Sequence, residues 1–469
     1  MKLHFRLLLL LVFVLPVHAQ TQPNILVILA DDLGYNDLGF QGSKDIATPH
    51  LDALAAQSVR CTSGYVSHPF CSPTRAGFLA GRYQQRFGHE TNPDWLPQST
   101  NDGFPISQIT LADLLRKQNY RTGIVGKWHL GAHPQFHPLK RGFDECFALL
   151  GGGHSYFPTP PRKGEYNLAL DRNGASTAQK GYLTDQLGDE ACAFMDRHQS
   201  KPWFLYLAFN APHTPLQAPK EETDKLTHIT NPKRRTYAAM VQIMDTNIGK
   251  VLAQLDATRQ RENTLVFFLN DNGGPLGQGK ADSWADNAPL RGGKTDFYEG
   301  GSRVPFLIHW PAKLKPAVFD QPVTSLDIMA TALALAHGPM PADRVMDGVN
   351  LIPHLTGQIT TPPHDTLYWR GEGPGGKYGI RRGDWKLVRL DDQPAELYNL
   401  ATDIGETHNL AAAHPDKVAE LVAAIAEWEK GTIEPAFPPP PRHQTAKDKA
   451  REAARREREA AGLPPIPAK

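Results

Sequence analysis

Short uninterrupted apolar runs, each ending in polar residues and followed by a helical pattern, constrain the fold of this chain more than any other feature. The clearest four are Asn24–Asp31, Tyr120–Gly126, Trp203–Asn210 and Thr264–Asn270. A strand that is apolar on both of its faces is typical of a parallel sheet covered by helices on both sides. We therefore predict an α/β fold built on a large, mostly parallel sheet flanked by helices.

Three helices between these runs begin at recognisable start signals. Thr48 is expected to cap a helix from Pro49 to about Ser58, and Thr110 to cap one over Leu111–Gln118. Pro232 opens a longer helix that reaches about Leu255. Ser, Thr, Asn and Asp are favoured at the N-cap, and Pro is tolerated in the first turn, where its missing N–H costs nothing.

The pattern changes beyond about residue 365. Four short strands are predicted, at Leu367–Trp369, Tyr378–Arg381, Trp385–Leu390 and Glu396–Tyr398, with a helix near Asp416–Trp428. We expect a catalytic domain over residues 20–365 and a smaller C-terminal α+β subdomain over residues 366–437. Residues 438–469, rich in Pro, Ala, Arg, Lys and Glu, are predicted to be a solvated helix or a disordered tail.

The first 19 residues have the pattern of a signal peptide. Lys2 and Arg6 precede the apolar run Leu7–Leu15, and Val17–Ala19 provides small residues for cleavage. The run is too short for a permanent transmembrane helix, so we expect a periplasmic or secreted protein without a membrane span. A formal net charge of +1 over 469 residues argues against nucleic-acid binding.

Polar side chains follow each of the four apolar runs. Because the carboxyl ends of parallel strands meet at one edge of a sheet, these side chains should gather there. Four of them offer hard oxygen ligands, which favour Ca²⁺ or Mg²⁺ over zinc: Asp31, Asp32, Asp271 and Asn272. A second set consists of basic and imidazole groups, of which only Lys127, His129 and His213 follow the runs: Arg75, Lys127, His129, His213 and Lys294. Together they predict a pocket for a tetrahedral oxyanion beside a divalent cation.

The four cysteines, Cys61, Cys71, Cys146 and Cys192, could form two disulfides in an oxidising compartment. Their wide, irregular spacing does not match a dense disulfide framework. Cys71 stands apart, because it lies in the stretch His68–Gly81 next to Ser-Pro-Thr-Arg.

The segment Cys71–Gly81 resembles the type I sulfatase signature Cys-x-Pro-x-Arg, and Tyr120–His129 resembles the second signature of that family. Thr74 replaces a commoner Ser, and Asn119 a usual Gly; neither carries a reacting group. The likeness spans about residues 22–410, because four further segments match: Asn24–Asp32, Ala211–Pro215, Asn270–Gly274 and Arg291–Lys294.

The resemblance implies an alkaline phosphatase-like fold and a specific chemistry. A separate maturation enzyme would oxidise Cys71 to Cα-formylglycine, whose hydrate attacks the sulfur of a sulfate ester; the second hydroxyl then expels sulfate. It also implies that Asp31, Asp32, Asp271, Asn272 and residue 71 hold Ca²⁺. Arg75, Lys127 and Lys294 would compensate charge, His129 would take the diol proton, and His213 would protonate the leaving alkoxide.

The expected substrate is a sulfated carbohydrate, because the chain resembles bacterial polysaccharide sulfatases and N-acetylgalactosamine sulfate sulfatases. Carrageenan and glycosaminoglycans are the candidates. The loops Gly151–Phe157 and Gly277–Leu290 carry His154 and Trp284, which we expect to contact sugar. Two alternatives remain: a phosphate-ester hydrolase of the alkaline phosphatase superfamily, whose usual two-zinc site has His ligands that this set lacks, and an inactive, glycan-binding relative.

Overall fold

The computed structural model describes residues 22–160, 165–277, 283–439, 449 and 453. The predicted signal peptide, residues 1–19, and nearly all of the predicted tail lie outside the described residues. Within the described part, no helix is both long and apolar enough to cross a membrane. The four cysteines are all free, so neither of the two possible disulfides forms.

A ten-stranded sheet forms the centre of the molecule, in the order β11-β2-β10-β9-β1-β8-β4-β5-β6-β7. Its five central strands are parallel, and three of them, β1, β8 and β9, are buried along their whole length. They are β9 (Thr264–Asn270), β1 (Asn24–Ala30), β8 (Trp203–Ala208), β4 (Arg121–Lys127) and β5 (Glu145–Leu149). The predicted mostly parallel sheet is confirmed, and all four apolar runs are strands in it.

Both margins of the sheet are mixed in direction. On one side β10 (Phe306–His309) runs antiparallel to β9 and to β2 (Val59–Cys61), and β11 (Ala317–Phe319) runs parallel to β2. On the other side β6 (Leu170–Arg172) and β7 (Ala175–Thr177) form an antiparallel hairpin against β5. A separate two-stranded sheet pairs β3 (Gly64–Tyr65) with β12 (Val323–Thr324).

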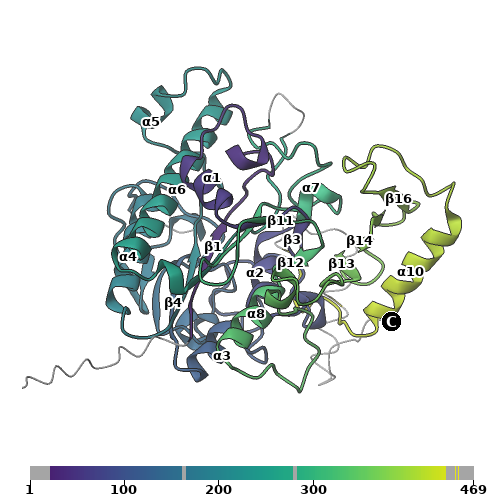
Figure 1. Cartoon of the computed structure of the whole chain (residues 1–469), viewed down its shortest axis with the longest axis horizontal. Coiled ribbons are helices and arrows are strands. Elements are labelled where there is room, and N and C mark those ends of the chain that lie inside the picture. The colour runs from purple at the N-terminus through teal and green to yellow at the C-terminus, as the bar shows by residue number, and fades with distance from the viewer. Residues whose placement is uncertain (1–21, 161–164, 278–282, 440–448, 450–452, 454–469) are drawn as a thin grey trace, which may run out of the picture.

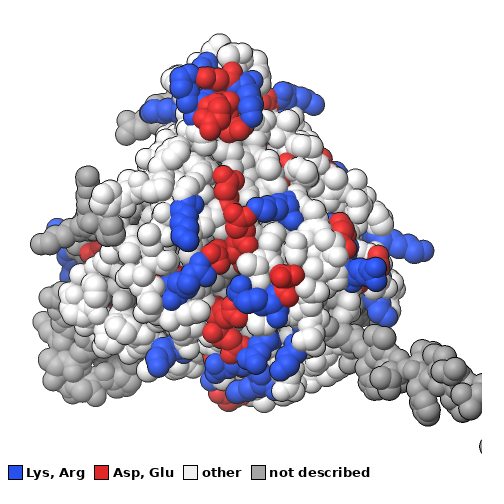
Figure 2. All heavy atoms as spheres, turned by 90° about the vertical axis from the view of Figure 1, so that its left-hand side faces the viewer, with Lys and Arg blue, Asp and Glu red and all other residues white. Residues whose placement is uncertain are grey.

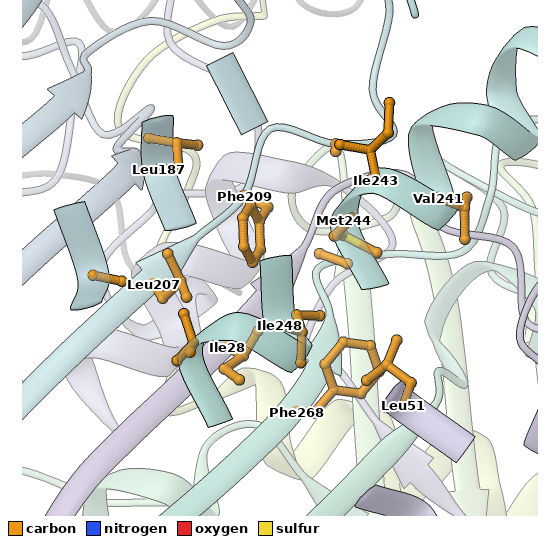
Figure 3. Close-up of a cluster of buried hydrophobic side chains, with 14 of the residues drawn as sticks. Ile28, Leu51, Leu187, Leu207, Phe209, Val241, Ile243, Met244, Ile248 and Phe268 are labelled. Carbon is orange, nitrogen blue, oxygen red and sulfur yellow. The ribbon is translucent and has the colours of Figure 1, made fainter. Parts of the chain in front are cut away.

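Alternate residues of β1 point into two apolar cores, one on each face of the sheet. One face is covered by α1 (Pro49–Ala56), α4 (Leu183–Arg197) and α6 (Pro232–Ala257), and the other by α2 (Cys71–Ala80), α3 (Leu111–Lys117) and α8 (Asp327–Leu335) (Figure 1). In the first core, Ile28 and Leu207 from the strands lie near Ile248 from α6 (Figure 3). Three further α-helices are short: α5 (Lys220–Asp224), α7 (Glu299–Ser302) and α9 (Ile352–Leu355), the last of which packs against the second core.

Four antiparallel strands and one helix form the C-terminal part of the described chain. The strands are β13 (Thr366–Gly371), β14 (Lys377–Arg382), β15 (Trp385–Arg389) and β16 (Glu396–Asn399), and the helix is α10 (Pro415–Glu429). Leu421 and Ile425 of α10 pack against one face of this sheet. A buried ionic cluster joins it to the main body, since Glu299 binds Lys386 of β15 at 2.9 Å and Arg303 at 3.2 Å. The exact residue at which one domain ends and the next begins stays a prediction.

Charged side chains of both signs are interspersed on the side of the molecule shown in Figure 2. Several are paired near α4, where Arg172 binds Glu190 and Lys250 binds Asp189. This mixing matches the net charge of +1.

The two predicted threonine caps have different outcomes. Thr110 forms a capping box with Asp113, in which each side chain binds the other residue's backbone N–H. Thr48 does not cap α1 with its side chain. Its Oγ1 instead accepts a hydrogen bond from Gly39 N–H at 2.8 Å and donates to Asp52 at 3.1 Å. Thr48 is thus the N-cap residue by position, as predicted, but it forms no cap hydrogen bond because a loop from earlier in the chain takes its hydroxyl.

Replacing Thr110 with Ala should lower the free energy of unfolding by about 1–2 kcal/mol, because the cap loses its acceptor. Thr110 is also fully buried, and its hydroxyl donates to Arg141 O at 2.8 Å. Urea denaturation followed by circular dichroism measures the change. Thr246→Ala on the exposed side of α6 is the matched control and should stay within about 0.5 kcal/mol; equal losses in the two variants would contradict the assignment.

Candidate active site

The site is centred on Cys71, the first residue of α2. Its thiol is 1 % exposed, and Sγ lies 3.8 Å from Asp31 Oδ1. Arg75 lies one helical turn further along α2, so both side chains project from the same face toward the carboxyl edge of the sheet. Burial raises the pKa of the Cys71 thiol to about 12. An unmodified thiol here stays protonated at neutral pH and is a poor nucleophile.

Three carboxylates meet where β1 and β9 end. Asp31 and Asp32 follow β1, Asp271 follows β9, and the two strands are paired up to Ala30 and Asn270, so their ends coincide. All three side chains are buried. The ligand atoms of Asp31, Asp32, Cys71 and His213 all lie within 4.8 Å of one another. The predicted hard-oxygen groups therefore converge at one place.

Each carboxylate has a close cationic partner, and Arg75 also lies 3.8 Å from Asp31. Lys127 Nζ lies 2.6 Å from Asp31 Oδ2, and Lys294 Nζ lies 2.7 Å from Asp32 Oδ1. Arg75 binds Asp271 Oδ2 through Nε at 3.1 Å and Nη2 at 2.7 Å. The three pairs leave the pocket with no net charge. This balance matters because the pocket is almost closed to water.

The acids differ in proton affinity because their surroundings differ. Burial acts to raise the pKa of Asp32, but the charges of Lys294, His213 and Lys127 outweigh it and hold that pKa well below its usual range. Burial and the nearby Asp31 charge raise the pKa of Asp271 to about 6. Asp271 is thus the carboxylate whose ionised form a further positive charge would stabilise most.

Two buried imidazoles, His129 after β4 and His213 after β8, complete the set. His213 Nδ1 lies 2.7 Å from Thr214 O, and Nε2 lies 3.6 Å from Asp32 Oδ2. Burial lowers the pKa of His213 to about 3 and holds that of His129 well below its usual range. Both rings are therefore neutral at pH 7. Since Nδ1 of His213 must donate to the carbonyl, its Nε2 presents a lone pair to the pocket.

The structure thus brings together every residue predicted for the metal and oxyanion pocket. Asn272 lies with them, because its Nδ2 donates to Asp32 Oδ1 at 2.8 Å. The predicted sugar contacts are placed differently. Both ring nitrogens of His154 lie 2.8 Å from backbone carbonyls, of Ser155 and Leu168, and the side chain is buried. It holds the loop together and has no nitrogen left for a sugar, so that prediction is not supported. Trp284 packs against the apolar core, and its role stays a prediction.

Sequence reasoning missed the residues that brace this pocket. Asn287 Oδ1 accepts hydrogen bonds from Gly274 N–H at 2.9 Å and Tyr35 N–H at 3.2 Å, while its Nδ2 donates to Gly274 O at 2.8 Å. It thereby fixes the loop beside Lys294, whose N–H donates to the same carbonyl. Tyr156 OH lies 2.6 Å from Asn210 O and 2.8 Å from His213 O and supports the His213 loop. No local pattern marks these residues, because their partners are distant in sequence.

Comparison with known proteins identifies the family. Residues 23–338 match the sulfatase family model, and residues 293–429 match the model for the C-terminal part of N-sulphoglucosamine sulphohydrolase. The chain belongs to the sulfatase family. Its class is therefore that of the sulfuric ester hydrolases.

Individual relatives agree with this sulfatase assignment. The chain is 36 % identical over 376 residues to N-acetylgalactosamine-6-sulfatase of Canis lupus familiaris, covering 76 % of this chain and 70 % of the relative. It is 30 % identical over 499 residues to the uncharacterized sulfatase YdeN of Escherichia coli, covering 87 % and 85 %. A crystal structure of Ps i-CgsB in complex with k-i-k-neocarrahexaose superimposes with a TM-score of 0.86 at 37 % identity, covering 94 % of this chain and 99 % of that one.

Gly152 lies against His129, and a side chain there should disturb the sulfatase site. A Cβ at Gly152 would lie 2.6 Å from His129 Nε2, while the backbone of Gly152 is outside the left-handed region. Gly152→Ala should therefore move the imidazole and lower kcat/KM for 4-nitrophenyl sulfate by roughly a hundredfold, with little loss of stability. Gly405→Ala is the control, because its Cβ would have more room: the nearest neighbour would lie at 3.2 Å, against 2.6 Å at Gly152. Wild-type kinetics in Gly152→Ala would show that His129 tolerates displacement.

Proposed function

We propose that this sulfatase hydrolyses a sulfate ester on a carbohydrate in the periplasm or outside the cell, using Ca²⁺ and a formylglycine made from Cys71 by a maturation enzyme. The observation that carries the proposal is the position of Cys71. Its side chain lies at the N-terminus of a buried helix, 3.8 Å from Asp31 Oδ1, inside a charge-balanced pocket with two neutral imidazoles.

The residues present fit a bound calcium ion. Their donors are carboxylate and amide oxygens, which suit a hard cation. Among the described residues, the buried Asn272 Oδ1 finds no hydrogen-bond partner. A divalent cation would satisfy it and relieve the repulsion among the three carboxylates. Asp31, Asp32, Asp271, Asn272 and residue 71 would hold the ion, which would polarise a sulfate oxygen when bound.

The properties of Cys71 fit conversion to an aldehyde. Because burial raises the pKa of the thiol to about 12, the unmodified residue supplies almost no thiolate. The hydrate of formylglycine would supply an oxygen nucleophile instead. A divalent cation, a singly charged sulfate monoester and a deprotonated nucleophile add no net charge, so the balanced pocket stays balanced in the reaction.

The remaining residues of this chain handle charge and protons. Lys127 and Lys294 reach the pocket with their ammonium groups and stabilise negative charge on the sulfate oxygens. His129 is neutral and can accept the proton of the attacking hydroxyl. The anionic substrate raises the proton affinity of His213, so a ring that is neutral in the free enzyme becomes able to protonate the leaving alkoxide. A low pKa in the free enzyme is thus compatible with an acid role.

Carbohydrate is the proposed substrate class because of the relatives. One is an N-acetylgalactosamine-6-sulfatase, and another structure holds a neocarrahexaose. A screen of defined carrageenan and glycosaminoglycan oligosaccharides, with 4-nitrophenyl sulfate and 4-nitrophenyl phosphate alongside, tests the proposal. Desulfation of at least one saccharide is expected. Faster turnover of the phosphate ester, or saccharide binding without desulfation, would overturn it.

Cys71→Ala should abolish sulfatase activity, with a fall in kcat of at least about a thousandfold, because the nucleophile is gone. The fold should persist, which circular dichroism checks. Cys192→Ala is the matched control, since Cys192 lies half-buried on α4 and should leave turnover unchanged. Mass spectrometry of the peptide around residue 71 should show loss of sulfur in active enzyme; full activity with the thiol intact would refute the assignment.

Removal of calcium should lower activity and the melting temperature together, because the three buried carboxylates lose their shared cation. Dialysis against a chelator followed by metal add-back measures both effects. Ca²⁺ should restore activity and Tm. Restoration by Zn²⁺ but not by Ca²⁺ would contradict the oxygen-ligand site.

A further inference from the structure

Two successive hydrogen bonds run behind the pocket and end on the backbone of His129. Ser72, the residue after Cys71 in α2, donates from Oγ to His129 O at 2.6 Å. The same Oγ lies 2.7 Å from His89 Nε2. Ser72 and His89 are both fully buried, so water does not compete for these bonds. They therefore link the residue next to the proposed nucleophile with the proposed base.

The protons on these two hydrogen bonds can be assigned from chemistry. A carbonyl oxygen only accepts, so the single hydroxyl proton of Ser72 points to His129 O. Ser72 Oγ must then accept from His89, which requires the tautomer with the proton on Nε2. Burial lowers the pKa of His89 to about 3, so its ring is neutral at pH 7. His89 is therefore a fixed N–H donor and not a group that titrates near neutral pH.

His129 needs this support because its backbone is in an unfavourable conformation. Its φ is +57°, in the left-handed region that residues with a Cβ seldom adopt. Hydrogen bonds fix the residue on both sides, since its N–H donates to Leu150 O at 3.1 Å and its carbonyl accepts from Ser72. A strained backbone of this kind persists only where neighbouring groups hold it. The direction of the His129 ring thus depends on the carbonyl that Ser72 holds.

Two aromatic side chains hold the ring of His89 in turn. The rings of Phe104 and Phe437 are nearly perpendicular to it, with centroids 6.4 Å and 4.9 Å away. Phe437 is 1 % exposed and belongs to the segment that follows α10. That segment is hydrogen-bonded to the residue before His89, because Ala436 N–H donates to Gly88 O at 2.8 Å. The C-terminal part of the described chain therefore helps to orient a ring that lies one hydrogen bond from α2.

We propose that His89 is a positioning residue of this sulfatase. Its Nε2–H directs the Ser72 hydroxyl to the carbonyl of His129, and that hydrogen bond fixes the imidazole of His129 relative to the nucleophile at residue 71. This placement matters because proton transfer needs the base within hydrogen-bond reach of the attacking hydroxyl. The inference rests on the proposed function, in which His129 accepts that proton.

The test compares His89→Phe with His89→Gln. Phe keeps a ring against Phe104 and Phe437 but has no N–H, whereas the side-chain amide of Gln can donate to Ser72. His89→Phe should lower kcat for 4-nitrophenyl sulfate roughly tenfold or more and leave KM within about twofold, because substrate contacts are unchanged. His89→Gln should recover most of that kcat. Mass spectrometry of the peptide around residue 71 corrects each rate for the fraction converted to formylglycine.

A double-mutant cycle with Ser72→Ala distinguishes positioning of His129 from general support of the fold. Ser72→Ala keeps the Cys-x-Pro-x-Arg pattern and removes the hydroxyl that joins the two imidazoles. Once that hydroxyl is gone, His89→Phe should cause no further loss of kcat, so the double variant should match Ser72→Ala within about twofold. Losses that multiply would show that His89 acts by another route and would overturn the inference.

The tautomer of His89 can be measured whether or not the enzyme cleaves sulfate esters. Long-range proton–nitrogen NMR spectra of histidine-labelled protein report it, with the His89 signals identified by their absence in His89→Phe. They should show a proton on Nε2 alone between about pH 5 and pH 8, since the ring does not titrate there. A proton on Nδ1, or titration within this range, would contradict the inference.

His198→Phe is the matched control. His198 also makes a hydrogen bond through Nε2, to Glu145 at 2.6 Å, and its ring also contacts a phenylalanine, Phe194. Glu145 is the first residue of β5, at the edge of the sheet opposite the pocket, so kcat should be unchanged. If wild type hydrolyses no sulfate ester, the proposed function fails. If it does and His89→Phe keeps the wild-type kcat, the positioning role alone is wrong.

Discussion

The pairing of three buried carboxylates with three cations, of which Lys127 and Arg75 are buried and Lys294 is half-buried, is the constraint on which the site depends. Unpaired, any one of these charges would be costly inside the protein, and removal of a single partner from such a pair typically costs about 3–5 kcal/mol. The pairing requires that the ends of β1, β4 and β9 meet the first two turns of α2, since those elements supply Asp31, Lys127, Asp271 and Arg75. The parallel sheet is thus the framework that places each charge beside its partner and so allows a dense ionic pocket.

Burial then decides what the pocket groups can do. The same exclusion of water keeps His129 and His213 neutral and the Cys71 thiol protonated. A polar network holds them in position from behind: Ser72 Oγ donates to His129 O at 2.6 Å and also contacts His89 Nε2 at 2.7 Å. Donors fixed before substrate arrives need no reorganisation when negative charge develops, which is the source of most electrostatic catalysis.

Prediction from sequence succeeded where a local pattern matched its surroundings. The apolar runs became strands because an apolar strand can satisfy its backbone only inside a sheet, and the capping box at Thr110 formed because both of its partners lie within one turn. At Thr48 and His154 other segments supplied the partners: Thr48 is the N-cap residue by position but forms no cap hydrogen bond, and His154 is buried within its loop. The Thr48 hydroxyl was taken by Gly39 N–H, and both His154 nitrogens by backbone carbonyls.

The sequence by itself determined the fold class, the family motif around Cys71 and the types of group at the sheet edge, because strand periodicity and motif spacing are properties of neighbouring residues. The tertiary structure alone decided which charges pair and which side chains border the imidazoles. Lys127 meets Asp31 across 96 positions of the chain, and Lys294 meets Asp32 across 262. His89 carries no motif, and its link to His129 through Ser72 exists only because α2 packs beside the end of β4. Contacts over such distances depend on how the layers pack, which no local pattern encodes.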